Sequence, residues 1–388
     1  MTGNNSAVPP RSNEIEVSLF GPGYGESVLI HLGLQQWIIV DSCIDQNSHR
    51  PAALGYLENL GVDPAQAVKL IVVTHWHDDH IKGLGELMAS CNLAKFVCSA
   101  ALRCEEFLEL VESYSQRSMM RSSGVEEFRK VLDVLKTRKS KYTELSPLPK
   151  FAISDRLLWK NPPEAAIPCE VFSLSPSDMS LNLAFQEIKS LLPQEGERKK
   201  RIIARGPNHA AVVLWINVRD TCLLLGSDLE ESSIAGTGWS VIVDSKTRPD
   251  GRAFIFKIPH HGSKNADQPQ VWQNMLVDEV MAITTPFLRG SVNLPTKSDV
   301  DRICSRTSHA YITAPPKRRR LSKSSGAIAK TIRETVRDIR ECTGQDGQIR
   351  LRLNLSELPE GTWNVELFGA SCDLRHAVLS AQGCSPAQ

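Results

Sequence analysis

A run of six residues, HWHDDH at positions 75–80, most constrains how this chain can fold. It directly follows the segment VKLIVVT at 68–74, whose β-branched residues predict a buried strand. Neutral imidazole and carboxylate groups are natural ligands of Zn²⁺ and similar ions. Such a concentration of these groups at the end of one buried strand predicts a metal site at the edge of a sheet.

The spacing of the run suits two ions. His75 and His77 project to the same side of an extended turn, so they can share one ion. Asp79 and His80 lie on the following turn and can reach a second ion. The alternative is a polar turn that is merely hydrogen-bonded, and the matching residues elsewhere in the chain argue against it.

Three further apolar segments end in residues of the same kinds. Asp41 ends WIIVD, Asp228 ends LLLGSD, and His260 and His261 follow AFIFKIP. Binding residues commonly lie on loops that a rigid scaffold positions. We therefore expect these strand ends to meet at one edge of a sheet, with a simple strand-end cap as the alternative for Asp41.

The motifs in this order resemble those of a known family. HWHDDH is similar to the signature of the metallo-β-lactamase fold hydrolases, and the order aspartate, HxHxDH, GSD, PHHGS is similar to that superfamily's motif order. The combination FGPGYGESVLIHL, VDSC, LLLGSD and KIPHHGS resembles one branch, the hydrolase domain of bacterial competence (DNA-uptake) channels and its soluble stand-alone relatives. The resemblance implies an α/β fold, a four-layer αββα sandwich with a dinuclear metal site at one edge.

The resemblance also implies roles for individual residues. Carried over by position, His75 and His77 would bind the first ion, Asp79 and His80 the second, and Asp228 would bridge the two. The implied ions are two divalent cations, with Zn²⁺ favoured and Mn²⁺ as the alternative. Iron-bearing members usually carry a carboxylate where this chain has His77, which disfavours redox iron.

Other roles stay open between neighbouring residues. One of His260 and His261 would complete the second site, and the other member, or Asp79, would give a proton to the leaving group. The family usually has one more ligand before the bridging aspartate, and the candidates are Asn208 and His209. Asp41 would hydrogen-bond the ligands from behind.

The organisation of the chain follows from composition and periodicity. Residues 141–185 are rich in proline and predict irregular structure with one strand at CEVFSL. The predicted segments are a disordered arm at 1–13, a hydrolase domain at 14–315 with a helical insert at about 100–140, a basic linker at 316–326, and a C-terminal extension at 327–388 whose helix and strands pack on the sandwich before a disordered tail.

Charge and cysteine content bound the class of protein. With 45 Lys+Arg and 44 Asp+Glu the net charge is +1, which argues against a wholesale polyanion binder. Local basic residues remain as candidate contacts to nucleic acid, with solvated loops as the alternative: Lys82, Lys199, Lys200, Arg201, Lys317, Arg318, Arg319 and Arg320. Ten cysteines without a CxxC pair predict reduced thiols in a cytoplasmic protein, and no signal peptide or membrane-spanning run is visible.

These observations favour a dinuclear metallohydrolase that uses a metal-bridged hydroxide. A phosphodiesterase or nuclease that acts on nucleic acid or nucleotides is preferred, because a dinuclear site suits in-line displacement at phosphorus. One alternative is a hydrolase of carboxylic esters or lactones, since fold does not decide substrate. The other is an effector of the antiviral defence type, silent until a regulatory protein partner releases it, with docking surfaces at 100–140 and 327–375.

Overall fold

A computed structural model describes residues 8–115, 124–141, 149–162, 164–192, 208–289, 292–316, 346–357 and 361–379 of the chain. The basic runs Lys199–Arg201 and Lys317–Arg320, the predicted helix after residue 326 and the end of the chain lie outside these residues. Among the described helices, none is long and apolar enough to cross a membrane.

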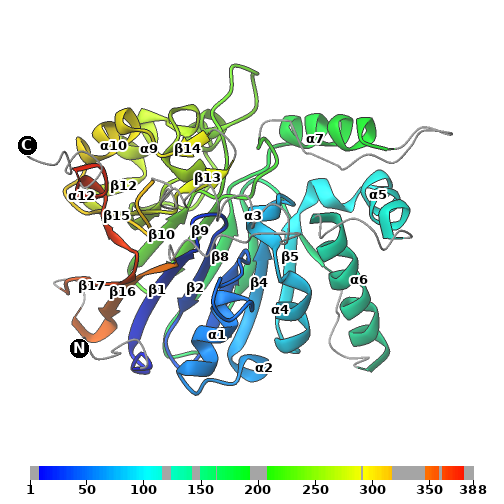
Figure 1. Ribbon diagram of the computed structural model, residues 1–388, viewed down its shortest axis with the longest axis horizontal. Coiled ribbons are helices and arrows are strands. Elements are labelled where there is room, and N and C mark those ends of the chain that lie inside the picture. The colour runs from blue at the N-terminus through cyan, green and yellow to red at the C-terminus, as the bar shows by residue number, and fades with distance from the viewer. Residues whose placement is uncertain are drawn as a thin grey trace, which may run out of the picture.

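Two eight-stranded sheets form the centre of the molecule (Figure 1). The first sheet contains, in spatial order, β17 (Asn364–Gly369), β16 (Gly347–Asn354), β1 (Glu14–Gly21), β2 (Ser27–His31), β3 (Trp37–Val40), β4 (Val68–Val73), β5 (Lys95–Ser99) and β6 (Lys150–Ala152). The second contains β18 (Cys372–Asp373), β15 (Ala310–Ile312), β12 (Leu276–Thr284), β11 (Ala253–Lys257), β10 (Thr221–Leu225), β9 (Leu214–Val218), β8 (Cys169–Ser173) and β7 (Arg156–Lys160).

Three apolar clusters show that the molecule has four layers. The middle cluster packs the facing sides of the two sheets together, as with Val17 and Ile216. On the outer face of the first sheet, a second cluster holds α1 (Ala52–Asn59), α4 (Leu84–Ser90), α5 (Glu105–Ser115) and α6 (Gly124–Lys141). On the outer face of the second sheet, a third cluster holds α8 (Trp239–Asp244), α9 (Pro269–Asn274), α10 (Lys297–Cys304) and α12 (Leu374–Leu379). The predicted αββα sandwich is therefore confirmed.

Parallel strands bring the expected strand ends together. In the first sheet β3 and β4 are parallel neighbours, so Asp41 and His75 follow strands that end at the same edge. In the second sheet β10, β11 and β12 are parallel, so the loops after residues 225, 257 and 284 also leave one edge. Consecutive β-branched and apolar residues on β4 form such a strand because both of its faces are buried.

The strand predicted at CEVFSL is present as β8, but the prediction of irregular structure for the rest of 141–185 is wrong in the described part of that stretch. Strands β6 and β7 also lie there, and α7 (Asp178–Ser190) begins at its end. Ser177 is the N-cap of α7, because its side chain accepts a hydrogen bond from the backbone N–H of Ser180. The described prolines of this stretch lie between the elements, so the number of prolines concealed the short strands.

The last described strands belong to the sheets themselves. β16 pairs with β1 over its whole length and β17 pairs with β16, whereas β18 pairs with β15 of the other sheet. Ion pairs between side chains connect β16 to its neighbours β1 and β17. Arg352 of β16 forms an ion pair of 2.7 Å with Glu16, which is fully buried and also accepts a hydrogen bond from Tyr56.

This ion pair gives a test of how far the C-terminal strands stabilise the sandwich. Arg352→Met leaves the Glu16 carboxylate buried without its cation, which should reduce the free energy of unfolding by about 3 kcal/mol. Chemical denaturation measures the change. Arg50→Met is the matched control, because its partners Glu58 and Glu86 are exposed, and a much smaller loss is expected. Equal losses in the two variants would contradict the assignment.

Candidate metal centre

Three imidazole rings point the same nitrogen into one buried space. In His75, His80 and His261 the Nε2 atom is buried and has no hydrogen-bond partner. The other ring nitrogen, Nδ1, is held in each case: by Thr74 Oγ1 at 2.9 Å for His75, by Asp41 Oδ2 at 2.7 Å for His80, and by Thr285 Oγ1 at 3.0 Å for His261. An orphaned Nε2 with an anchored Nδ1 is the arrangement of a histidine that binds a metal.

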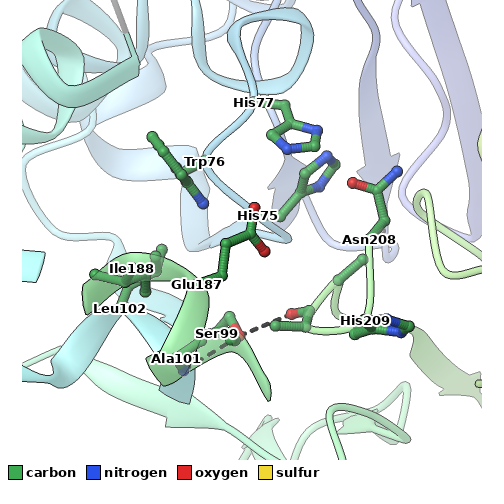
Figure 2. Close-up of a pocket in the computed structure, with 13 residues that line it drawn as sticks. His75, Trp76, His77, Ser99, Ala101, Leu102, Glu187, Ile188, Asn208 and His209 are labelled. Carbon is green, nitrogen blue, oxygen red and sulfur yellow. Dashed lines mark hydrogen bonds between the residues drawn. The ribbon is translucent and has the colours of Figure 1, made fainter. Parts of the chain in front are cut away.

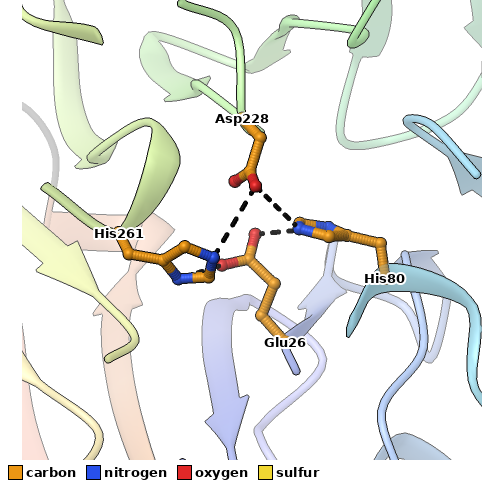
Figure 3. A group of neighbouring side chains, drawn as sticks. All are labelled: Glu26, His80, Asp228 and His261. Atoms are coloured by element: carbon orange, nitrogen blue, oxygen red, sulfur yellow. Dashed lines mark ion pairs between the residues drawn. The ribbon is translucent and has the colours of Figure 1, made fainter. Parts of the chain in front are cut away.

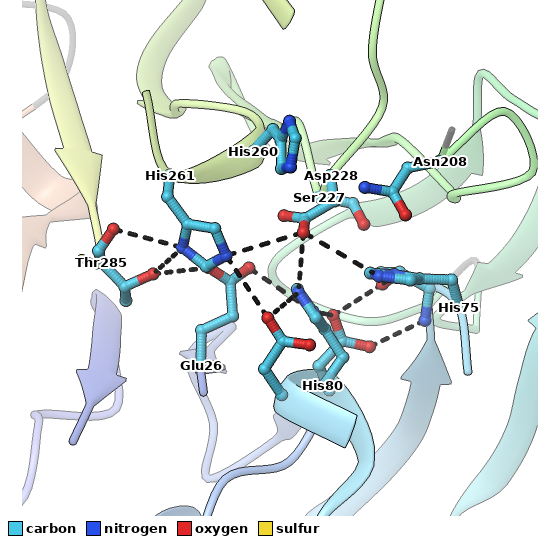
Figure 4. Close-up of polar contacts among 12 residues, drawn as sticks. Glu26, His75, His80, Asn208, Ser227, Asp228, His260, His261 and Thr285 are labelled. Carbon is cyan, nitrogen blue, oxygen red and sulfur yellow. Dashed lines mark hydrogen bonds and ion pairs between the residues drawn. The ribbon is translucent and has the colours of Figure 1, made fainter. Parts of the chain in front are cut away.

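Two carboxylates complete this convergence (Figure 4). Asp228 Oδ2 lies 3.3 Å from His80 Nε2 and 3.6 Å from His261 Nε2. Asp79 Oδ2 lies 3.5 Å from His261 Nε2 and 3.9 Å from His80 Nε2. Tetrahedral zinc with bonds of about 2.0–2.1 Å needs donors about 3.3–3.4 Å apart. Asp79, His80, Asp228 and His261 therefore fit a divalent ion, and the structure brings the predicted second set together.

The other predicted set lies beside the first. His75 Nε2 is 4.0 Å from Asp228 Oδ2, and the rings of His75 and His77 are 4.6 Å apart between centroids. Asp228 thus lies between the two sets, where a bridging carboxylate would be. In Figure 2 the side chain of Asn208 extends toward the rings of His75 and His77, whereas the side chain of His209 points away from them. The Oδ1 atom of Asn208 is buried and unpartnered, which suits a third donor.

The two histidines of PHHGS separate in the fold. His261 is fully buried among the carboxylates, but His260 remains about one fifth exposed and its Nδ1 lies 3.0 Å from Asn265 Oδ1. Both residues have positive φ, 46° and 53°, a conformation that non-glycine residues seldom adopt. This backbone turns the two rings in different directions, so only His261 reaches the ligand positions.

The sequence analysis missed Glu26 and Lys257. Glu26, His80, Asp228 and His261 place ligand-type atoms within 4.8 Å of one another (Figure 3). The Glu26 oxygens, however, lie 3.8 and 3.9 Å from the Nδ1 atoms of His80 and His261, on the side away from Asp228. They are occupied by Lys257 Nζ at 2.5 Å and Thr285 Oγ1 at 2.8 Å. Glu26 therefore supports the rings from behind, as Asp41 does for His80 Nδ1.

A weak signal for this pair was present in the chain. Glu26 lies in GPGYGES, a glycine-rich segment that predicts a turn, and Lys257 directly precedes the IPHHGS motif. A lysine inside the apolar run AFIFKIP is fully buried, and such a charge needs a partner. The ion pair joins the β1–β2 loop of one sheet to β11 of the other.

Charge within the cluster sets the proton affinities of its members. Burial opposes charge on His80, but the carboxylates of Asp228, Asp41 and Glu26 outweigh it and raise the pKa of His80 well above its usual range. The pKa of His261 is raised in the same way, chiefly by Asp228 against the effect of burial. For His75 burial dominates and lowers its pKa well below the usual value, so this ring is neutral at pH 7.

Lys82 is the described member of the predicted basic contacts. It follows α3 (Asp78–Ile81), and its ammonium lies 4.7 Å from the centre of the Tyr24 ring. Tyr24 packs on Phe287 of β13 (Phe287–Arg289), and Phe287 packs on His261. A small hollow on the opposite side of the cluster is lined by His75, His77, Asn208 and by Glu187 of α7, as Figure 2 shows.

Comparison with known proteins gives a family match. The family profile described as "Metallo-beta-lactamase superfamily" matches residues 20–265. No curated protein matches the chain. Similar solved structures include the metallo-beta-lactamase fold protein YhfI from Bacillus subtilis, with 11% identity and a TM-score of 0.37 over 77% of this chain and 95% of that one. A metallo-beta-lactamase from Cronobacter sakazakii has 16% identity and a TM-score of 0.32 over 62% of this chain and 76% of that one. MEM-A1, a subclass B3 metallo-beta-lactamase from a soil metagenome library, has 16% identity and a TM-score of 0.30 over 67% of this chain and 83% of that one.

Metal binding should release protons. Because the pKa values of His80 and His261 are raised, each ring keeps its proton to higher pH than an ordinary histidine in the metal-free protein and must lose it to bind an ion. Calorimetric titration with Zn²⁺ in buffers of different ionisation enthalpy should therefore show that protons are released on binding at pH 7. As the pH rises above 6.5 and through the raised pKa values, release should fall and affinity should increase. Release that does not change with pH would contradict the arrangement.

Asp41 should matter for the metal although it does not reach the ligand side. In Asp41→Asn the carboxylate that anchors His80 Nδ1 is lost, and the Zn²⁺ affinity should fall about 10–100-fold. Competition with a chromogenic chelator measures it. Asp63→Asn is the control, because Asp63 caps α2 (Pro64–Ala67) and asparagine caps helices equally well. Unchanged affinity in Asp41→Asn would show that Asp41 only caps its strand.

Proposed function

Since the chain belongs to the metallo-beta-lactamase superfamily, we propose that it is a metal-dependent hydrolase with two divalent ions and that its substrate is a phosphodiester of a nucleotide or nucleic acid. One observation carries the metal-dependent part. Three buried Nε2 atoms without partners converge on the carboxylates of Asp79 and Asp228. Leaving several polar atoms buried and unpaired is costly, unless a cation binds among them.

The donors divide into two sets that share one carboxylate. His75, His77 and Asn208 would hold one ion, and Asp79, His80 and His261 would hold the other, with Asp228 between them. Zn²⁺ suits this mixture of imidazole and carboxylate donors, and Mn²⁺ is the second choice. Bound divalent ions supply a water of lowered pKa and positive charge that stabilises a developing negative charge.

The leaving group needs a proton, and the structure favours one of the predicted donors. His261 has its Nδ1 on Thr285 and its Nε2 among the ligands, so it has no free position. Burial would raise the pKa of Asp79, but the neighbouring imidazoles of His261 and His80 outweigh burial and lower it, so Asp79 holds no proton at neutral pH. His260 is partly exposed beside the centre, with Nδ1 held by Asn265, and we assign the proton transfer to its Nε2.

Support for a phosphodiester substrate comes from charge and geometry. A pair of ions on one bridging carboxylate suits in-line displacement, because each ion can act on one of the two oxygens that exchange at phosphorus. Lys82 adds an ammonium group next to the ligand-bearing helix α3, where it would attract a phosphate. The predicted basic runs at 199–201 and 317–320 would extend this attraction.

The test is an activity panel on protein whose metal content has been measured. Zn²⁺ or Mn²⁺ is added, and the substrates are a chromogenic phosphodiester, single- and double-stranded DNA, RNA, a lactone and a β-lactam. Asp228→Ala removes the shared carboxylate and should lower the turnover rate by at least about 10³-fold. Asp133→Ala, on the exposed face of α6, is the matched control and should retain full activity.

Each result leads to a different conclusion. Cleavage of phosphodiesters that Asp228→Ala loses would support the proposal, and cleavage of the lactone or β-lactam alone would overturn the substrate class. Two bound ions without any turnover would favour the effector that a protein partner controls. A protein that binds no metal would overturn the metal-dependent mechanism altogether.

A further inference from the structure

A carboxylate just outside the metal centre joins two of its residues. Glu230 lies two positions after Asp228, and its side chain is mostly buried. Its Oε1 accepts hydrogen bonds from the Asn208 backbone N–H at 3.4 Å and from Asn208 Nδ2 at 3.3 Å. Its Oε2 accepts from Asn265 Nδ2 at 2.7 Å. The two oxygens therefore hold two different amide groups at once.

The first contact decides which way the Asn208 amide points. An ionised carboxylate only accepts hydrogen bonds, so the amide nitrogen must face Glu230 and the amide oxygen must face away. That oxygen, Oδ1, is buried without a partner, and Figure 4 places Asn208 beside His75 and Asp228. Only the oxygen of an amide binds a metal ion, so the reversed amide would remove a ligand. It would also place the Asn208 oxygen against the Glu230 oxygen, and these two acceptors repel each other.

The second contact decides the orientation of His260 by the same logic. Since the Asn265 nitrogen donates to Glu230, its oxygen faces outward and accepts from His260 Nδ1 at 3.0 Å. The Nδ1 atom of His260 must then carry hydrogen, which leaves Nε2 as the atom that faces the substrate side. The backbone of residue 231 also donates to Asn265 O at 2.8 Å, which fixes the asparagine itself.

We propose that Glu230 is a positioning residue, which aims the Asn208 oxygen at the first metal position and at the same time sets the ring of His260. The proposal rests on the proposed function, because Asn208 as a donor and His260 as the proton carrier belong to it. Glu230 is not among the proposed ligands of either ion. It acts through two amides whose orientation a single pair of acceptor oxygens determines, and its Oε1 also lies 3.7 Å from His260 Nδ1, which favours a proton on that nitrogen.

Glu230→Ala tests this directly because it removes both acceptor oxygens. The Asn208 and Asn265 amides then lose the acceptor that holds them, so each can turn over. Metal-free protein is titrated with Co²⁺, whose visible spectrum reports each site. We expect the variant to lose affinity about 10-fold or more at the first site and to keep the second site unchanged. Glu231→Ala is the matched control, because Glu231 contacts Ser240 and not the centre.

A double-mutant cycle separates positioning from a general loss of structure. If Glu230 acts through Asn208, then Glu230→Ala should have no further effect on the first site in an Asn208→Ala background. Additive losses, equal weakening of both sites, or no effect of Glu230→Ala would each overturn the proposal. Thermal unfolding of each variant shows that the fold is retained.

A second readout concerns His260 and requires no metal. Nitrogen-15 NMR of the metal-free protein should show the Nδ1–H tautomer for His260 in the wild type, and a mixture of tautomers in Glu230→Ala, in which Asn265 can turn over. Wild-type protein that binds two Co²⁺ ions but gives an additive cycle would refute the role of Glu230 and leave the proposed function intact. Wild-type protein that binds no Co²⁺ would refute both.

Discussion

A buried excess of negative charge is the constraint on which the rest of this structure depends. Four carboxylates, Glu26, Asp41, Asp79 and Asp228, are 2–5% exposed and lie within one small region. Removing such groups from water is costly unless opposite charges and hydrogen bonds compensate them. The ammonium of Lys257 compensates part of the excess, and protonated imidazoles compensate more in the metal-free protein. Divalent ions meet the same need, and this links metal binding to the stability of the fold.

The sandwich supplies the rigidity that such a cluster requires. Among the described residues, Asp41, Ser227, His260 and His261 all have positive φ without being glycine. Each such residue costs of the order of 1–3 kcal/mol, so it persists only where the surrounding structure leaves no alternative. All four follow strands buried between layers, and hydrogen bonds such as that from His260 N–H to Ser227 O connect the loops. Packing of the sheets thus maintains a backbone that the loops alone would not adopt.

The polar groups around the centre form an inner set and an outer set, which orient different residues. The inner set, Asp41, Glu26, Thr74 and Thr285, contacts Nδ1 atoms and fixes how the imidazoles face. The outer set runs through Glu230 to Asn208, Asn265 and His260 and is partly exposed. Changes in the inner set should alter the affinity for both ions, because this set orients the imidazoles of both positions. Changes in the outer set should alter the first position, through Asn208, and the tautomer of His260.

From the chain alone, the order of the motifs predicted the fold class through the family that it resembles, and the residues at strand ends predicted the ligand candidates, because both are local properties of the sequence. His75, His77, Asp79 and His80 could be identified within one segment. Tertiary structure alone distinguished His261 from His260 and Asn208 from His209, since neighbouring residues have the same chemistry and differ only in where the backbone turns them. It alone joined Glu26 to Lys257 as well, since that contact spans the two sheets and leaves no periodic pattern in the chain.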